Sequence, residues 1–255
     1  MKLRTIIFIL VIAVIGLSIA GVISLPSIWN SIVGETEPPE TVTLERVVDA
    51  SEFTNLKIDW AAGSIRLVTG NTDKITIQET KNVGNTHDMV TEYNGKNLTI
   101  RYASGISANM ANLSAKDLTI IVPQDWVCQK LEITGAALDT TASGLNAQVV
   151  KLSGAATKLQ YTGTIQELEC DGAAAQISLN CDNAPQEVDI NGAACKLSLM
   201  LPASTGFTVS TEGVAVDFNS DAACTFSNNT YTHGDGSCKV KISGLGCTVS
   251  VNHNK

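Results

Sequence analysis

Apolar and polar residues alternate along most of the chain after residue 41, a pattern typical of β-strands with one buried face. The alternation changes phase at recurring glycines. Before Gly135 the apolar positions are Leu131 and Ile133, whereas after Gly192 they are Cys195 and Leu197. A straight strand cannot accommodate this shift, so we expect a bend or bulge at each glycine.

These glycines define a repeat with separations of 19, 18, 20, 21 and 31 residues, and the six structural corner glycines are Gly135, Gly154, Gly172, Gly192, Gly213 and Gly244. In the less regular first part, Ala62 takes the place of Gly135, so that Ile58 matches Leu131. A period of roughly 20 residues suits one coil of a solenoid. The predicted fold class is therefore all-β, a single-stranded β-helix or solenoid over 41–255. A sandwich that feeds a solenoid is the alternative.

The start of the chain has a different character, because residues 5–25 form a run of 21 residues without a charge. As a helix this run spans roughly 31 Å, about one bilayer core. Lys2 and Arg4 precede it, which favours a cytosolic N-terminus. We therefore expect a cytosolic stub at 1–4, one N-terminal transmembrane helix or signal anchor at 5–25, a linker at 26–40 and an extracytoplasmic body at 41–255. A cleaved signal peptide and a secreted body are the alternative.

Composition narrows the choice of partners. The formal net charge is −8, and charged residues make up only 16% of the chain. An acidic body without a basic stripe argues against nucleic acid as a partner. Small polar residues with few aromatics favour stacked β-structure over a helix bundle.

The last, longer separation leaves about ten extra residues between two coils, and such insertions often lie on a binding face. The candidate binding loop consists of Thr225, Phe226, Tyr231, His233 and Asp235. Cys224 and Cys238 flank it and are the candidate disulfide, since an extracytoplasmic address permits one. Three other cysteines fall on inward positions, where they act as small hydrophobes: Cys170, Cys195 and Cys247. Seven cysteines in all leave at least one thiol free or intermolecular.

The residues offer no catalytic or metal-binding pattern. Neither a Cys-x-x-Cys pair nor a Gly-x-Ser-x-Gly turn occurs, and the three histidines are scattered. The segment from Asp217 begins like a calcium loop, but Ala222 replaces the turn glycine and Asn228 the final glutamate. We expect no enzyme, no metal and no cofactor.

Two phrases add a resemblance to a known family. "LTIIVPQDW" precedes the repeats and "LSLMLPASTGFTVSTEG" interrupts them. With the apolar N-terminal segment, the chain resembles the bacterial cell-envelope putative-adhesin family, a β-helical domain family of unknown function, over residues 45–252. The resemblance implies a β-helical fold and no established catalytic residues.

The expected function is a non-catalytic, membrane-tethered extracytoplasmic module, adhesin-like or structural, at the cell membrane. Its expected partners are the membrane through the N-terminal helix, an envelope protein or polysaccharide, or a second copy of itself. An accessory sensor or regulator of an envelope-stress system is the alternative. An enzyme that acts on polysaccharides is the third hypothesis.

Overall fold

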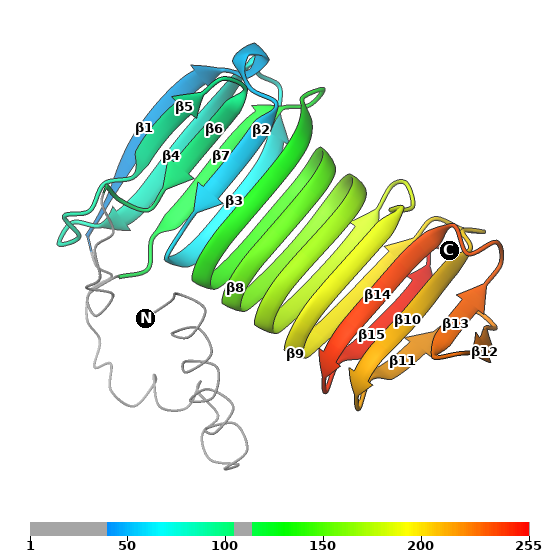
Figure 1. Ribbon diagram of the computed structural model, residues 1–255. Coiled ribbons are helices and arrows are strands. Elements are labelled where there is room, and N and C mark those ends of the chain that lie inside the picture. Colours follow the sequence, from blue (N-terminus) through cyan, green and yellow to red (C-terminus); the bar gives the residue numbers. More distant parts are fainter. Residues whose placement is uncertain (1–39, 105–113, 255) are drawn as a thin grey trace, which may run out of the picture.

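The structure, a computed structural model, describes residues 40–104 and 114–254. This part of the chain is all-β: fifteen strands join in one mixed sheet, with a single short 3-10 helix. Figure 1 shows the strands side by side along one long axis, with the early strands at one end and the late strands at the other.

The regular middle consists of β8 (Val127–Cys181) and β9 (Glu187–Leu201). A straight strand of 55 residues would reach roughly 180 Å, so β8 must turn back on itself. Figure 1 shows it as several parallel turns. In the pairing of β8 with β9, Leu168 lies opposite Val188 and Gly172 opposite Gly192. Each segment therefore lies in parallel beside the segment one repeat later.

Close stacking of backbone explains the corner glycines. A Cβ on Gly192 would collide with the carbonyl oxygen of Gly172, and a Cβ on Gly172 would lie 2.9 Å from that of Gly154. Of the six corner glycines only Gly213 has a positive φ, +141°. The expectation that an unusual φ selects glycine thus applies to Gly213. The other five are glycine because the backbone of a neighbouring segment, earlier in the chain, lies too close for a side chain.

The N-terminal end has the following elements: β1 (Thr41–Asp49), η1 (Ala50–Glu52), β2 (Asn55–Asp59), β3 (Ala62–Gly70), β4 (Lys74–Asn82), β5 (Val90–Asn94), β6 (Asn97–Arg101) and β7 (Asp117–Pro123). Strands β2 and β3 both pair in parallel with β8. On its other side, β2 pairs in parallel with β6, and β3 pairs in parallel with β7. Antiparallel strands complete this end: β4 pairs with β7, β1 with β4, and β5 with β6.

The C-terminal end has the following elements: β10 (Phe207–Val214), β11 (Asp217–Ser220), β12 (Thr225–Ser227), β13 (Thr230–His233), β14 (Cys238–Leu245) and β15 (Thr248–His253). Strand β14 pairs in parallel with β9 on one side and β10 on the other, and β15 likewise lies between β9 and β11. The last strands of the chain are therefore inserted between β9 and the strands that precede them in sequence.

The interior contains the residues that the alternation marked as inward, including Leu131, Ile133 and Leu197, all at most 1% exposed. Most large buried aromatic residues lie toward the ends, as Trp60, Tyr102 and Phe207 do, whereas Tyr161 lies in the middle. Aliphatic side chains fill most of the middle, and aromatic rings help close the interior at the ends.

The predicted fold class was wrong. The strands form one mixed sheet of 15 strands, with antiparallel pairs at both ends and a strand order that departs from chain order, rather than a clear single-stranded β-helix. The predicted transmembrane helix is not supported either. No helix in residues 40–104 or 114–254 is long and apolar enough to cross a bilayer. The stub at 1–4, the span at 5–25 and all but the last residue of the linker at 26–40 lie outside the described residues.

Candidate functional site

The insertion between Cys224 and Cys238 forms a hairpin of β12 and β13. It was expected to project between two coils, but it extends the sheet beyond β10, because β13 pairs with β10 and β12 with β13. Asn228 and Asn229 at its tip have φ values of 49° and 56°. Two successive positive φ values are the signature of a tight type I′ turn, which asparagine tolerates. The hairpin is thus a defined edge of the sheet.

A row of aromatic rings leads from this edge to the interior. Phe226 is 59% exposed, and its ring centroid lies 4.6 Å from that of Tyr231. The Tyr231 ring lies 4.4 Å from Phe218, which lies 6.3 Å from the buried ring of Phe207. These separations fall in or near the usual range for paired rings. The exposed ring of Phe226 is therefore supported from below by packed aromatic neighbours.

The histidine of the candidate loop, His233, takes part in packing and in a hydrogen bond to the backbone. His233 packs against Phe207 at 5.4 Å, and its Nδ1 lies 2.9 Å from the carbonyl oxygen of Ala223. The ring of His253 packs against both Phe207 and His233. Its Nδ1 lies 3.2 Å from Asp221, and its backbone N–H donates to the same carboxylate. The backbone N–H of His253, together with its ring, lowers the pKa of Asp221. These contacts hold the last strand to the turn after β11.

Thr225 and Asp235 complete the predicted loop. Thr225 is exposed on β12, where its hydroxyl donates to the carbonyl oxygen of Thr232 at 3.4 Å. Asp235 accepts a hydrogen bond from the backbone N–H of Ser237 at 3.1 Å, as an aspartate that shapes a turn does. Of the five predicted binding residues, the structure brings Phe226 and Tyr231 together and directs His233 and Asp235 to structural roles.

The structure does not bring the thiols of Cys224 and Cys238 together. Cys224 precedes β12 and Cys238 begins β14, and strands β13 and β10 lie between those two strands. Three strand spacings amount to roughly 14 Å, whereas disulfides need Cα atoms within about 7 Å. Both cysteines are free thiols in this structure.

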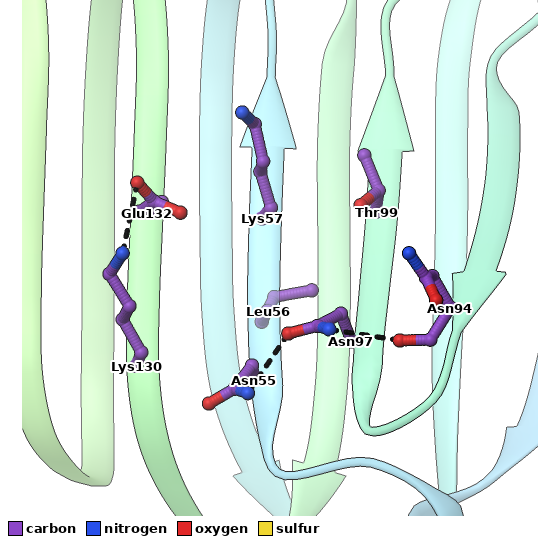
Figure 2. Close-up of a pocket in the computed structure, with 8 residues that line it drawn as sticks. All are labelled: Asn55, Leu56, Lys57, Asn94, Asn97, Thr99, Lys130 and Glu132. Carbon is purple, nitrogen blue, oxygen red and sulfur yellow. Dashed lines mark hydrogen bonds and ion pairs between the residues drawn. The ribbon is translucent and has the colours of Figure 1, made fainter.

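A second candidate is a shallow polar hollow of about 260 Å³ on the outer face of β2, β6 and β8. Figure 2 shows its side chains, which include an amide row across neighbouring strands. Asn55 donates to Asn97 at 2.9 Å, and Asn97 donates to the carbonyl oxygen of Asn94 at 2.9 Å. Lys130 forms an ion pair with Glu132 at 3.2 Å. The side chains that line this shallow hollow can donate and accept hydrogen bonds.

Sequence reasoning missed a buried ion pair at the N-terminal end. Lys116 and Glu79 are 1% and 0% exposed, and the ammonium group of Lys116 contacts the Glu79 carboxylate. The same ammonium group lies 3.8 Å from the ring centre of Tyr102 and 5.0 Å from that of Trp60. Burial lowers the pKa of Lys116, although the contact with Glu79 opposes that effect. The pair belongs to the packing of this end and is closed to solvent.

A signal for this pair was present in the sequence. In "DKITIQET" the residues Ile75, Ile77 and Glu79 share one phase, and Lys116 stands in phase with Leu118 in "KDLTIIVP". Charged residues at inward positions predict a buried pair when two such strands are neighbours. Here β4 and β7 pair with Glu79 opposite Leu118.

We also searched the described residues for side chains that could hold a metal ion. Within the described residues, no three or more His, Cys, Asp or Glu side chains converge as a metal site.

Comparisons with known proteins place the fold. No protein-family model matches the chain, and no curated protein matches it. A putative cell adhesion protein from Clostridium sporogenes is similar in structure, with a TM-score of 0.54 at 16% identity over 84% of this chain and 100% of that chain. A putative adhesin from Bacteroides fragilis has a TM-score of 0.49 at 13% identity, over 83% and 98% of the two chains.

At this identity the likeness to the Clostridium sporogenes protein shows a shared fold. It agrees with the resemblance to the putative-adhesin family at that level.

Proposed function

We propose that the chain is a non-catalytic, adhesin-like binding module that contacts envelope polysaccharide through the hairpin of β12 and β13. The observation that carries the proposal is the exposed ring of Phe226, packed on Tyr231 at the outermost strand of the sheet. A partner that covers this ring would remove its apolar surface from water, which favours binding there.

Sugar rings suit this surface better than another protein strand does. The face of an aromatic ring carries partial negative charge, which attracts the weakly positive C–H groups of a sugar. Thr225 and Thr230 lie on the opposite face of the hairpin from Phe226, which pairs with Tyr231, so the aromatic rings themselves supply the contact with the sugar. The free edge of β12 is only three residues long, and short edge strands discourage pairing with a second copy.

An extracytoplasmic location is part of the proposal. It is supported by the charge-free run at 5–25 behind Lys2 and Arg4, a sequence typical of chains that are sent across a membrane. Protease added to intact cells should digest the hairpin-bearing body. Protection of the body until the cells are lysed would contradict the location.

The binding test compares two exposed apolar side chains of equal exposure. Phe226 and Leu245 are each 59% exposed, but only Phe226 packs in the aromatic row. Co-sedimentation with purified, insoluble envelope polysaccharide should be about tenfold weaker for Phe226→Ala, as for loss of an aromatic anchor. Leu245→Ala should bind as the unaltered chain does.

Equal binding by Phe226→Ala and the unaltered chain would rule out the hairpin as the contact. Concentration-dependent dimers that Phe226→Ala abolishes, without any polysaccharide binding, would assign the surface to self-association instead. Light scattering coupled to size-exclusion chromatography measures the oligomeric state directly.

A further inference from the structure

Two buried thiols lie side by side where the inserted C-terminal strands meet the middle of the sheet. Cys195 belongs to β9, and Cys247 lies between β14 and β15. The parallel pairing of β15 with β9 begins with Thr248 opposite Lys196, so the residues immediately before these two are neighbours across the ladder. Both side chains point inward, at 5% and 1% exposure.

The sulfur atoms share one corner. The thiol of Cys247 donates to the carbonyl oxygen of Gly192 at 3.8 Å, and a Cβ on Gly192 would lie 2.6 Å from the sulfur of Cys195. Both are free thiols in this structure, and the pKa of Cys195 is raised first by burial and then by the neighbouring Cys247. Neighbouring strands lie about 4.8 Å apart, within the Cα separation of about 4.4–6.8 Å that disulfides require.

We propose that Cys195 and Cys247 form a disulfide that fastens the inserted strands β14 and β15 to β9. The oxidant is a disulfide, either a small molecule such as oxidised glutathione or the active-site disulfide of an oxidoreductase. One cysteine thiolate attacks it, forms a mixed disulfide and releases one thiol. The second thiolate attacks the mixed disulfide and releases the second thiol. The protein loses two protons and two electrons, and the oxidant gains them.

Burial sets the time at which the bond forms. Desolvation raises the pKa of Cys195 to about 12, so the folded protein holds almost no thiolate there. Oxidation therefore accompanies the docking of β15, before the corner closes. Once formed, the disulfide is shielded from dissolved reductants by the same burial. This inference does not depend on what the hairpin binds.

Peptide mapping tests the pairing. The full chain, produced in an oxidising compartment and purified in detergent, is alkylated at acidic pH, digested without reduction and analysed by mass spectrometry. We expect a linked peptide pair that contains Cys195 and Cys247, and alkylated thiols at Cys128 and Cys224. Alkylation of Cys195 and Cys247 in most molecules, or linkage of either to another cysteine such as Cys170, would overturn the proposal.

Thermal unfolding with and without reductant separates the disulfide from simple packing. A reductant present during unfolding should lower the Tm of the unaltered chain by about 10 °C, because the bond closes a long loop. Cys195→Ala, Cys247→Ala and the double variant should lose this response to reductant. Cys128→Ala, a buried control outside the pair, should keep it. A response retained by the double variant would assign the effect to other cysteines.

Discussion

The middle of the sheet and its two ends are built by different means. In β8 and β9 successive segments lie side by side in chain order, with glycine against glycine at the bend and aliphatic residues inside. At the ends chain order and spatial order separate: β6 and β7 lie outside β2 and β3, and β14 and β15 lie inside β10 and β11. Antiparallel strands occur only at the ends of the described sheet.

This difference shows that the repeat determines how one segment pairs with a neighbouring segment. It does not determine which segment that neighbour is. Every corner offers a glycine and a similar inward pattern to its neighbour. The ends are specified instead by single features, such as the buried pair of Glu79 and Lys116 and the aromatic row above Phe207. Mutations in the middle and mutations at an end should therefore differ in their effects on unfolding free energy and on hydrogen exchange.

The largest expected effect comes from removal of the inserted strands. Deletion of residues 238–255 takes away β14 and β15, the strands through which β10 and β11 pair with β9. We expect residues 207–233 to lose their protection in hydrogen exchange, and the free energy of unfolding to fall by more than about 5 kcal/mol. Deletion of residues 41–49, an edge strand that pairs only with β4, should leave that protection intact. If residues 207–233 kept their protection after deletion of residues 238–255, β14 and β15 would not be needed to hold β10 and β11 in the sheet.

The next effect concerns the N-terminal end. Lys116→Met leaves the buried carboxylate of Glu79 without its partner, which should cost about 3–5 kcal/mol of unfolding free energy. The double variant Lys116→Met/Glu79→Leu should recover most of this loss, because it leaves no buried charge. Lys151→Met breaks an exposed pair with Glu169 in the middle and should cost less than about 1 kcal/mol. Equal losses for Lys116→Met and Lys151→Met in denaturant titrations would argue against the buried pair.

The smallest effect tests the middle through its corners. Gly192→Ala places a Cβ against the carbonyl oxygen of Gly172 and should cost about 2–3 kcal/mol through overpacking. Gly172→Ala should cost less, since the nearest atom lies 2.9 Å away. Gly84→Ala meets no atom within 4 Å and serves as the neutral control. The same denaturant titrations rank the three variants, and a Gly172→Ala loss as large as that of Gly192→Ala would contradict close stacking as the cause.

Alternation in the sequence predicted the strands and the inward residues of the middle, because a period of two leaves one buried face. It predicted the register of the first part less well. Ile58 was matched with Leu131, whereas the structure pairs it with Ile133. A slip of two residues keeps the same face inward, so the pattern cannot detect it.

The order of the coils could not be read from the repeats. Gly244 stacks on Gly192 and Gly213 stacks on Gly244, although chain order places Gly213 between them. All three corners carry a glycine with the same close approach of backbone, so the glycine by itself does not choose between the two orders. One contact away from these glycines is that of His253 with Asp221 and with the carbonyl oxygen of Thr205, at 2.9 Å.

The candidate loop was predicted as an insertion from the length of the last separation between glycines. Its role as added strands was not predicted, because β12 and β13 are only three and four residues long. The exposure of Phe226 also depends on its place at the outer strand, which alternation alone does not reveal.

The inserted strands have a consequence for biosynthesis. A chain is synthesised from its N-terminus, so β10 to β13 emerge from the ribosome before β14 and β15, the strands with which β10 and β11 will finally pair. They must wait, or dock temporarily on β9, until residues 238–253 arrive and take the place between them. Completion of this end is thus coupled to completion of the chain, and a stalled or shortened product would carry an unfinished, adhesive edge that quality control could detect.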